Sequence, residues 1–146
     1  MKNRIHLFAG LTAAVTIAVF WTSTVISELS GSPELIAAVK TLIPWGFVIL
    51  VPALAATGGT GFALAGGRAG GLVAVKKKRM PIIAANGLLV LMPAAFYLAH
   101  KARAAEFDAA FFAVQAVELV FGAVNLVLLF MNARDGFRMT AKRRRL

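Results

Sequence analysis

Polar side chains that could bind a ligand or carry a proton follow one face of the last apolar stretch of the chain. They recur at helical spacing: Gln115, Glu118, Gly122, Asn125 and Asn132. A carboxyl group inside hydrocarbon is costly and is rarely tolerated without a role or a partner. Glu118 is therefore the main candidate for a proton site or a ligand anchor, and its stripe is expected to face protein or water.

Helical rise predicts which residues of other stretches share the depth of Glu118. From the expected cytoplasmic edge, Glu118 lies ~20 Å inside the membrane. Three residues come to the same depth: Ser23, Pro52 and Pro93. Each proline leaves a carbonyl without its helical partner, so both prolines are expected to supply hydrogen-bond acceptors near Glu118. Asn86 and Asn125 share a second depth, about 9 Å inside, and their amides are expected to pair.

Two interpretations of Glu118 stay open. In the first, the carboxyl group is protonated and joins helices through hydrogen bonds to neighbours such as Ser23 or Gln115. In the second, it carries a proton or a substrate, or anchors a bound headgroup. The first is favoured, because no second deep charge is expected that could form a relay with Glu118.

The two histidines do not form a haem or metal site by spacing. His6 lies at the start of the first apolar stretch and His100 at the far end of the third, of order 25 Å apart along the bundle, so one iron cannot bind both. A haem on His100 alone, beside Tyr97, is a less favoured b-type haem hypothesis. His100 is also a weak metal candidate, because acidic residues of the same side could approach it.

Enzyme motifs are lacking in the sequence. It contains no His-Glu-x-x-His and no Gly-x-Ser-x-Gly pattern, and its lack of cysteine excludes disulfides and thiolate metal sites. We therefore expect no catalytic residues, no metal and no cofactor.

The elements that would position these residues are apolar helices. Residues 5–27, 44–66, 80–99 and 109–131 are each near the ~20 residues needed to cross ~30 Å of hydrocarbon. With 146 residues, of which 60% are hydrophobic, the chain is expected to be one all-α domain, a polytopic bundle of four transmembrane helices. Glycines at 66, 67, 70 and 71 are expected to form the turn between the second and third spans.

A short interfacial helix is expected over residues 33–43, before the second span. Ser32 is a suitable N-cap, and Pro33 suits the first helical turn. Pro44 is expected to separate this helix from the span. Trp21 and Trp45 would then anchor at the outer interface.

Basic residues predict the orientation in the membrane. Of the 16 Lys and Arg residues, only Lys40, Lys101 and Arg103 fall on the side opposite both termini, so both ends should be cytoplasmic in a bacterial inner membrane. The net charge of +10 does not indicate nucleic-acid binding, because the charges flank membrane spans. Two basic groups are expected to bind anionic lipid: Lys76, Lys77, Lys78 and Arg79, and Arg143, Arg144 and Arg145.

Small residues recur every four positions in the second span, at Ala53, Thr57, Gly61 and Ala65. This spacing lets helix backbones approach closely, so the row is expected to pack against another helix. The leading functional expectation is a non-enzymatic accessory or scaffolding subunit of a membrane complex, or a homo-oligomer. The alternative is a small proton-coupled transporter or a ligand-binding bundle centred on Glu118.

Overall fold

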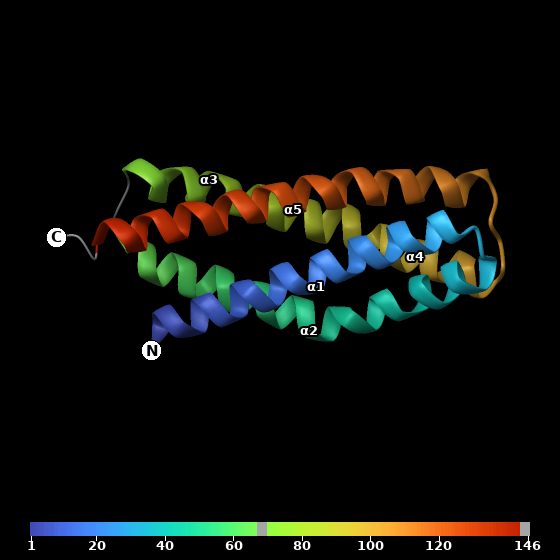
Figure 1. The fold of residues 1–146 in the computed structure, drawn as a ribbon, viewed down its shortest axis with the longest axis horizontal. Helices are drawn as coiled ribbons and strands as arrows, with labels where there is room; N and C mark the ends of the chain where they lie inside the picture. The colour runs from blue at the N-terminus through green and yellow to red at the C-terminus, as the bar shows by residue number, and fades with distance from the viewer. Residues whose placement is uncertain (67–69, 144–146) are drawn as a thin grey trace.

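The structure, a computed structural model, describes residues 1–66 and 70–143, with side chains up to residue 138 in the last helix. Its elements are α1 (Lys2–Ser30), α2 (Pro33–Ala65), α3 (Gly71–Asn86), the π-helical turn η1 (Gly87–Leu91), α4 (Met92–Arg103) and α5 (Ala109–Arg143). The elements α3, η1 and α4 follow one another directly and form one continuous rod (Figure 1). The described chain is thus all-helical, with four rods long and apolar enough to cross a membrane.

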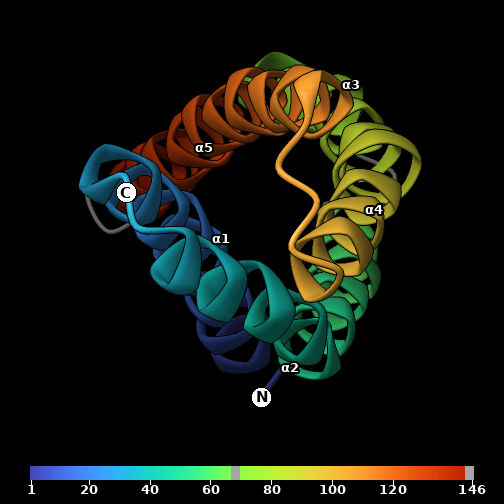
Figure 2. The ribbon, with the colours of Figure 1, turned by 90° about the vertical axis from the view of Figure 1, so that its right-hand side faces the viewer.

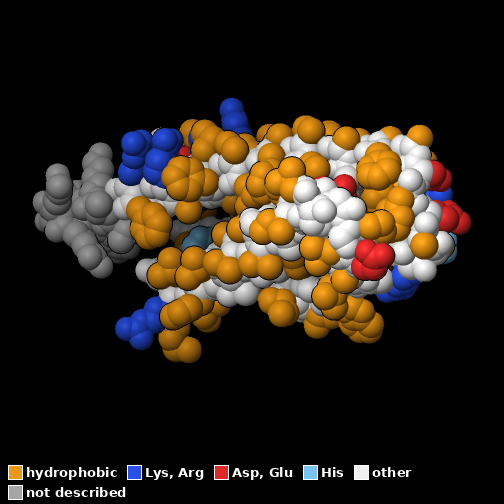
Figure 3. All heavy atoms as spheres, turned by 45° about the vertical axis from the view of Figure 1, so that its right-hand side comes forward, with side chains coloured by type: hydrophobic (Ala, Val, Ile, Leu, Met, Phe, Trp, Pro, Cys, Tyr) orange, Lys and Arg blue, Asp and Glu red, His pale blue; other side chains and the backbone are white. Residues whose placement is uncertain are grey.

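The four rods surround a common axis (Figure 2). Helix α1 packs against α2 and α5, α2 packs against α4, and both α3 and α4 pack against α5. Helix α1 begins and α5 ends at the same end of the bundle (Figure 1). We call this the basic end, because Lys and Arg gather there, whereas Asp and Glu gather mainly toward the opposite end (Figure 3).

Helix α2 differs from the prediction, because it runs from Pro33 to Ala65 without a break at Pro44. The predicted N-cap is confirmed: the hydroxyl of Ser32 accepts a hydrogen bond of 3.2 Å from the Leu35 N–H. The prediction of a separate interfacial helix over residues 33–43 is therefore wrong. A proline removes one backbone hydrogen bond, but the helix continues where neighbouring helices, here α1 and α4, hold both of its halves. The first three turns of α2, residues 33–43, therefore belong to the bundle.

The third and fourth rods are longer than the predicted spans 80–99 and 109–131. Helix α3 already begins at Gly71, so the basic residues from Lys76 to Arg79 lie within it, and α5 extends to Arg143. Lys and Arg have good helix propensity, so a span can continue through a basic segment beyond its hydrocarbon-crossing part. The predicted glycine turn is present at both of its ends: Gly66 and Gly71 have positive φ angles of 51° and 60°. Gly67 lies outside the described residues.

The small-residue row of α2 lies against α1. Ala53 is buried in a core cluster with Ala13 and Ile17. Thr57 is also buried, next to Gly10 of α1, where a Cβ added at Gly10 would lie 3.7 Å from the Thr57 methyl group. Close approach of α1 and α2 therefore depends on small side chains on both helices.

Replacing Gly46 with Ala is expected to destabilise this interface by about 1 to 3 kcal/mol. A Cβ at position 46 would lie 2.2 Å from Cζ of Phe20, and the Phe20 ring packs edge-on against Phe47 at 5.9 Å. The ring must therefore move or α1 must shift. Unfolding of the purified variant in detergent measures the loss. Gly59→Ala is the control, because a Cβ there meets nothing within 4 Å; equal unfolding curves for both variants would contradict this account of the interface.

Candidate ligand-binding site

The polar stripe of α5 faces the interior of the bundle, as its spacing predicts. Gln115, Asn125 and Asn132 are buried, and Glu118 retains only 12% of its side-chain exposure. Gly122 lies on the same interior face of α5 and is close to α1, because a Cβ added at Gly122 would lie 2.9 Å from the Trp21 ring.

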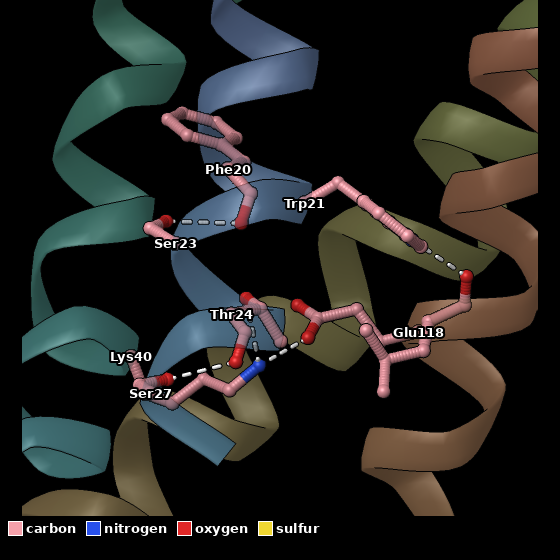
Figure 4. Close-up of polar contacts among 8 residues, drawn as sticks. Phe20, Trp21, Ser23, Thr24, Ser27, Lys40 and Glu118 are labelled. Carbon is pink, nitrogen blue, oxygen red and sulfur yellow. Dashed lines mark hydrogen bonds and ion pairs between the residues drawn. The ribbon is translucent and has the colours of Figure 1, made fainter. Parts of the chain in front are cut away.

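Lys40 is the residue that the sequence prediction missed. Its side chain is fully buried, and its ammonium group forms an ion pair with the Glu118 carboxylate and donates a hydrogen bond of 3.3 Å to Oγ1 of Thr24 (Figure 4). The prediction that no second deep charge accompanies Glu118 is therefore wrong. It failed because Lys40 was assigned to an outer interfacial helix, whereas the continuous α2 carries it into the bundle.

Further polar atoms surround the ion pair. Glu28 of α1 is close enough to Lys40 and Glu118 to interact with both electrostatically, and one of its carboxyl oxygens is buried without a protein partner. Both amide atoms of Gln115, one helical turn from Glu118, are likewise buried without a protein partner. Buried polar groups of this kind are usually satisfied by water or ligand. The end of the bundle opposite the basic end thus contains a buried polar cluster: Thr24, Glu28, Lys40, Gln115 and Glu118.

Three predicted neighbours of Glu118 do not join this cluster. The hydroxyl of Ser23 donates to the Phe20 carbonyl of its own helix, and the adjacent Thr24 takes its place beside Lys40. Pro52 and Pro93 are exposed on the outside of their helices. The depth argument failed here because equal depth does not fix direction, and one residue along a helix rotates the side chain by about 100°.

The predicted contact between Asn86 and Asn125 is present. The Asn86 amide donates to Oδ1 of Asn125 at 2.8 Å and to the Phe121 carbonyl at 3.0 Å. The Asn125 amide in turn donates to the Ile83 carbonyl at 3.4 Å. These bonds join α3 to α5 directly beside the π-helical turn η1, an irregularity often associated with functional sites.

A cavity of about 360 Å³ occupies the centre of the bundle. Its lining comes from every rod and is almost wholly apolar, with aromatic residues such as Phe20, Trp21 and Phe47. Thr24 and Glu118 bound it at the polar cluster, Asn125 lies along its wall, and Met80 belongs to its lining in α3. This size and composition are typical of a site for a small apolar molecule.

The chain matches no family model, no curated protein and no solved structure. The geometry of the cavity and its polar cluster therefore carries the functional argument.

The histidines lie apart from this cavity. His6 places Nδ1 3.1 Å from both the Thr57 carbonyl and the Thr60 hydroxyl, so it packs on α2, whereas His100 is exposed. Over the described residues no group of three potential metal ligands comes together. Near His100, Lys101 instead contacts both Glu106 and Asp108 at 2.7 Å.

Asp108 has a structural function at the start of α5. Its Oδ1 accepts a hydrogen bond of 2.9 Å from the Phe111 N–H, as an N-cap does. The hydrogen bond from Lys101 holds the pKa of Asp108 below its ordinary value. A carboxyl group whose pKa is lowered by folding stabilises the folded state at pH values above its ordinary pKa, and this contribution is lost as the pH falls through the lowered pKa. The contribution of the Asp108 cap is therefore fully present at neutral pH.

The basic residues of α3 that were predicted to bind lipid differ in their surroundings. Arg79 forms an ion pair of 2.7 Å with the buried Asp135 of α5, so it joins helices, whereas Lys78 is exposed. Lys76 and Lys77 are partly buried. Of the second predicted group, Arg144, Arg145 and the side chain of Arg143 lie outside the described residues.

Proposed function

We propose that this protein is an integral membrane bundle that binds a small apolar molecule in its central cavity. The observation that carries the proposal is the cavity of about 360 Å³, which combines an apolar wall with one carboxylate, Glu118, at the polar cluster. Sites for small molecules commonly have this form, with a few placed polar groups in an apolar enclosure. This proposed function is the ligand-binding alternative that the sequence left open.

The proposal includes a bacterial inner membrane with the basic end in the cytoplasm. The distribution of Lys and Arg supports this orientation, because basic residues in short connections resist translocation. Exposed apolar side chains cover the outside of the rods, as lipid contact requires (Figure 3). In this orientation the polar cluster lies in the outer half of the membrane.

Ligand binding has more support than the accessory-subunit function that the sequence favoured. The outward-facing apolar side chains suit lipid as well as a partner subunit or a second copy, so they do not distinguish these surroundings. An occupant of the cavity would supply the van der Waals contacts that an empty apolar space of this size forfeits.

Glu118 joins two helices, as the first interpretation expected, but through an ion pair with Lys40 in place of a protonated carboxyl group. The Lys40 ammonium group forms an ion pair with the Glu118 carboxylate, so this pair joins α2 to α5. Glu118 also borders the cavity, where it can orient a bound molecule. We therefore place it as a ligand anchor rather than as a proton carrier.

We place lateral access from the lipid near the basic end, between α2 and α3. Gly58 and Phe62 of α2 line the cavity opposite Met80, Pro81 and Ala84 of α3. A Cβ added at Gly58 would meet nothing within 4 Å. In this proposal a membrane-dissolved molecule enters the cavity between these two helix segments.

The test is the identification of bound molecules. The protein, purified from its membrane in mild detergent, is extracted with organic solvent, and the extract is analysed by mass spectrometry against extracts of an unrelated helical membrane protein. We expect one apolar species enriched to about one molecule per chain. An extract that matches the unrelated protein would contradict the proposal, and a stable second polypeptide without such a species would favour the accessory subunit.

A further inference from the structure

We infer that the cavity selects an amphiphile whose headgroup donates hydrogen bonds, either a hydroxyl or an ammonium group, and rejects an anionic headgroup. This inference rests on the proposed function and specifies its ligand. The headgroup would lie at Glu118, and the apolar body would extend along the cavity past Gly87 toward Met80.

The first argument is the free oxygen of Glu118. One carboxylate oxygen, Oε2, accepts from Lys40 (Figure 4), and among the described residues no hydrogen bond joins the other oxygen to protein. Glu118 lines the cavity, whereas Lys40 is fully buried behind it. A carboxylate oxygen is an acceptor only, so its natural partner in the cavity is a donor.

The second argument is that two other polar side chains of the cavity wall, those of Trp21 and Asn125, already have protein partners. The Trp21 indole N–H donates to the Leu119 carbonyl at 3.0 Å. Both ends of the Asn125 amide are bonded, to Asn86 and to the Ile83 carbonyl. The Thr24 hydroxyl accepts from Lys40 and keeps its own proton for donation, so it can complete the hydrogen bonding of a ligand hydroxyl.

The third argument is charge. Among the described residues that line the cavity, Glu118 is the only charged one, and no basic group faces the space. Glu28 adds a second carboxylate near the ion pair. Lys40, the cation of the cluster, does not line the cavity, so no ammonium group there is available to an anion. An anionic headgroup would therefore meet repulsion in a medium of low dielectric constant.

The experiment uses three probes with the same chain and different headgroups: hexadecanol, hexadecylamine and palmitate. Binding to the full-length protein in neutral detergent is measured by displacement of a fluorescent apolar probe. We expect hexadecanol and hexadecylamine to bind at least about tenfold more tightly than palmitate. A factor of this size corresponds to the contribution of one hydrogen bond to a charged group. The ratio of the affinities for hexadecanol and hexadecylamine then shows whether the site prefers a neutral or a cationic headgroup.

The matched control replaces both members of the ion pair, as Lys40→Met with Glu118→Leu. A buried ion pair can be exchanged for apolar residues of similar volume without loss of folding, so the cavity should persist. We expect the double variant to bind all three probes within about threefold of one another, well below the wild-type selectivity.

The outcomes separate this inference from the proposed function. If palmitate binds the wild type as tightly as hexadecanol, or if the double variant keeps the wild-type order, the headgroup inference is wrong while the cavity remains a binding site. If no probe binds the wild type, the proposed function itself fails.

Discussion

Replacing Lys40 alone with Met is expected to destabilise the bundle by about 3 to 5 kcal/mol. The substitution leaves Glu118 in the polar cluster without its cationic partner and near a second carboxylate, Glu28. An unpaired buried charge loses the compensation that made its burial tolerable. Unfolding in mixed micelles with increasing denaturing detergent measures the change.

The control for this prediction is the double variant Lys40→Met with Glu118→Leu. Removing both charges should recover most of the lost stability, because neither charge remains unpaired. A surface lysine such as Lys78 serves as a second control, and Lys78→Met should change stability by less than about 0.5 kcal/mol. A Lys40→Met protein as stable as the wild type would show that the ion pair does not form.

Replacing Gly58 with Leu is expected to lower the bound apolar species by about tenfold or more. The new side chain would extend into the cavity, where a Cβ meets nothing within 4 Å, so it fills the space that a ligand needs. A ligand that still entered would overpack the site by about 1 to 3 kcal/mol. Leu is also a better helix former than Gly, so the fold should not be weakened. Mass spectrometry of solvent extracts measures the occupancy.

Gly59→Leu is the matched control for this variant. Gly59 is the next residue of α2, is exposed, and also has open space around an added Cβ, but it does not line the cavity. The gain in helix propensity is therefore the same in both variants, and only Gly58→Leu should lose the ligand. Equal loss in both variants, or loss in neither, would contradict the location of the site.

The sequence predicted the number and character of the rods, and the interior direction of the α5 stripe, because both depend on local hydropathy and helical periodicity. It did not predict the partner of Glu118. The assignment of Lys40 to a separate helix followed from Pro44, whose local preference for breaking a helix was outweighed by packing against α1 and α4. Tertiary contacts of this kind cannot be read from a single segment.

Trp21 illustrates a second limit. Its aromatic type suggested an anchor at the outer interface, yet it lines the cavity and donates to the Leu119 carbonyl of α5. Residue type and depth gave no information on which helix it faces. The cavity itself was also unpredictable, because it results from the relative placement of all four rods. The contact of Asn86 with Asn125 was predictable, since equal depth and complementary amides suffice for such a pair.

The most direct test of a ligand-binding bundle is an experimental structure of the protein in lipid nanodiscs, prepared without added ligand. We predict elongated non-protein density along the central cavity, from the neighbourhood of Met80 to the carboxylate of Glu118, with Lys40 paired behind it. A cavity closed by inward rotation of Phe20 and Phe47, or Glu118 turned to the lipid without Lys40, would contradict the account.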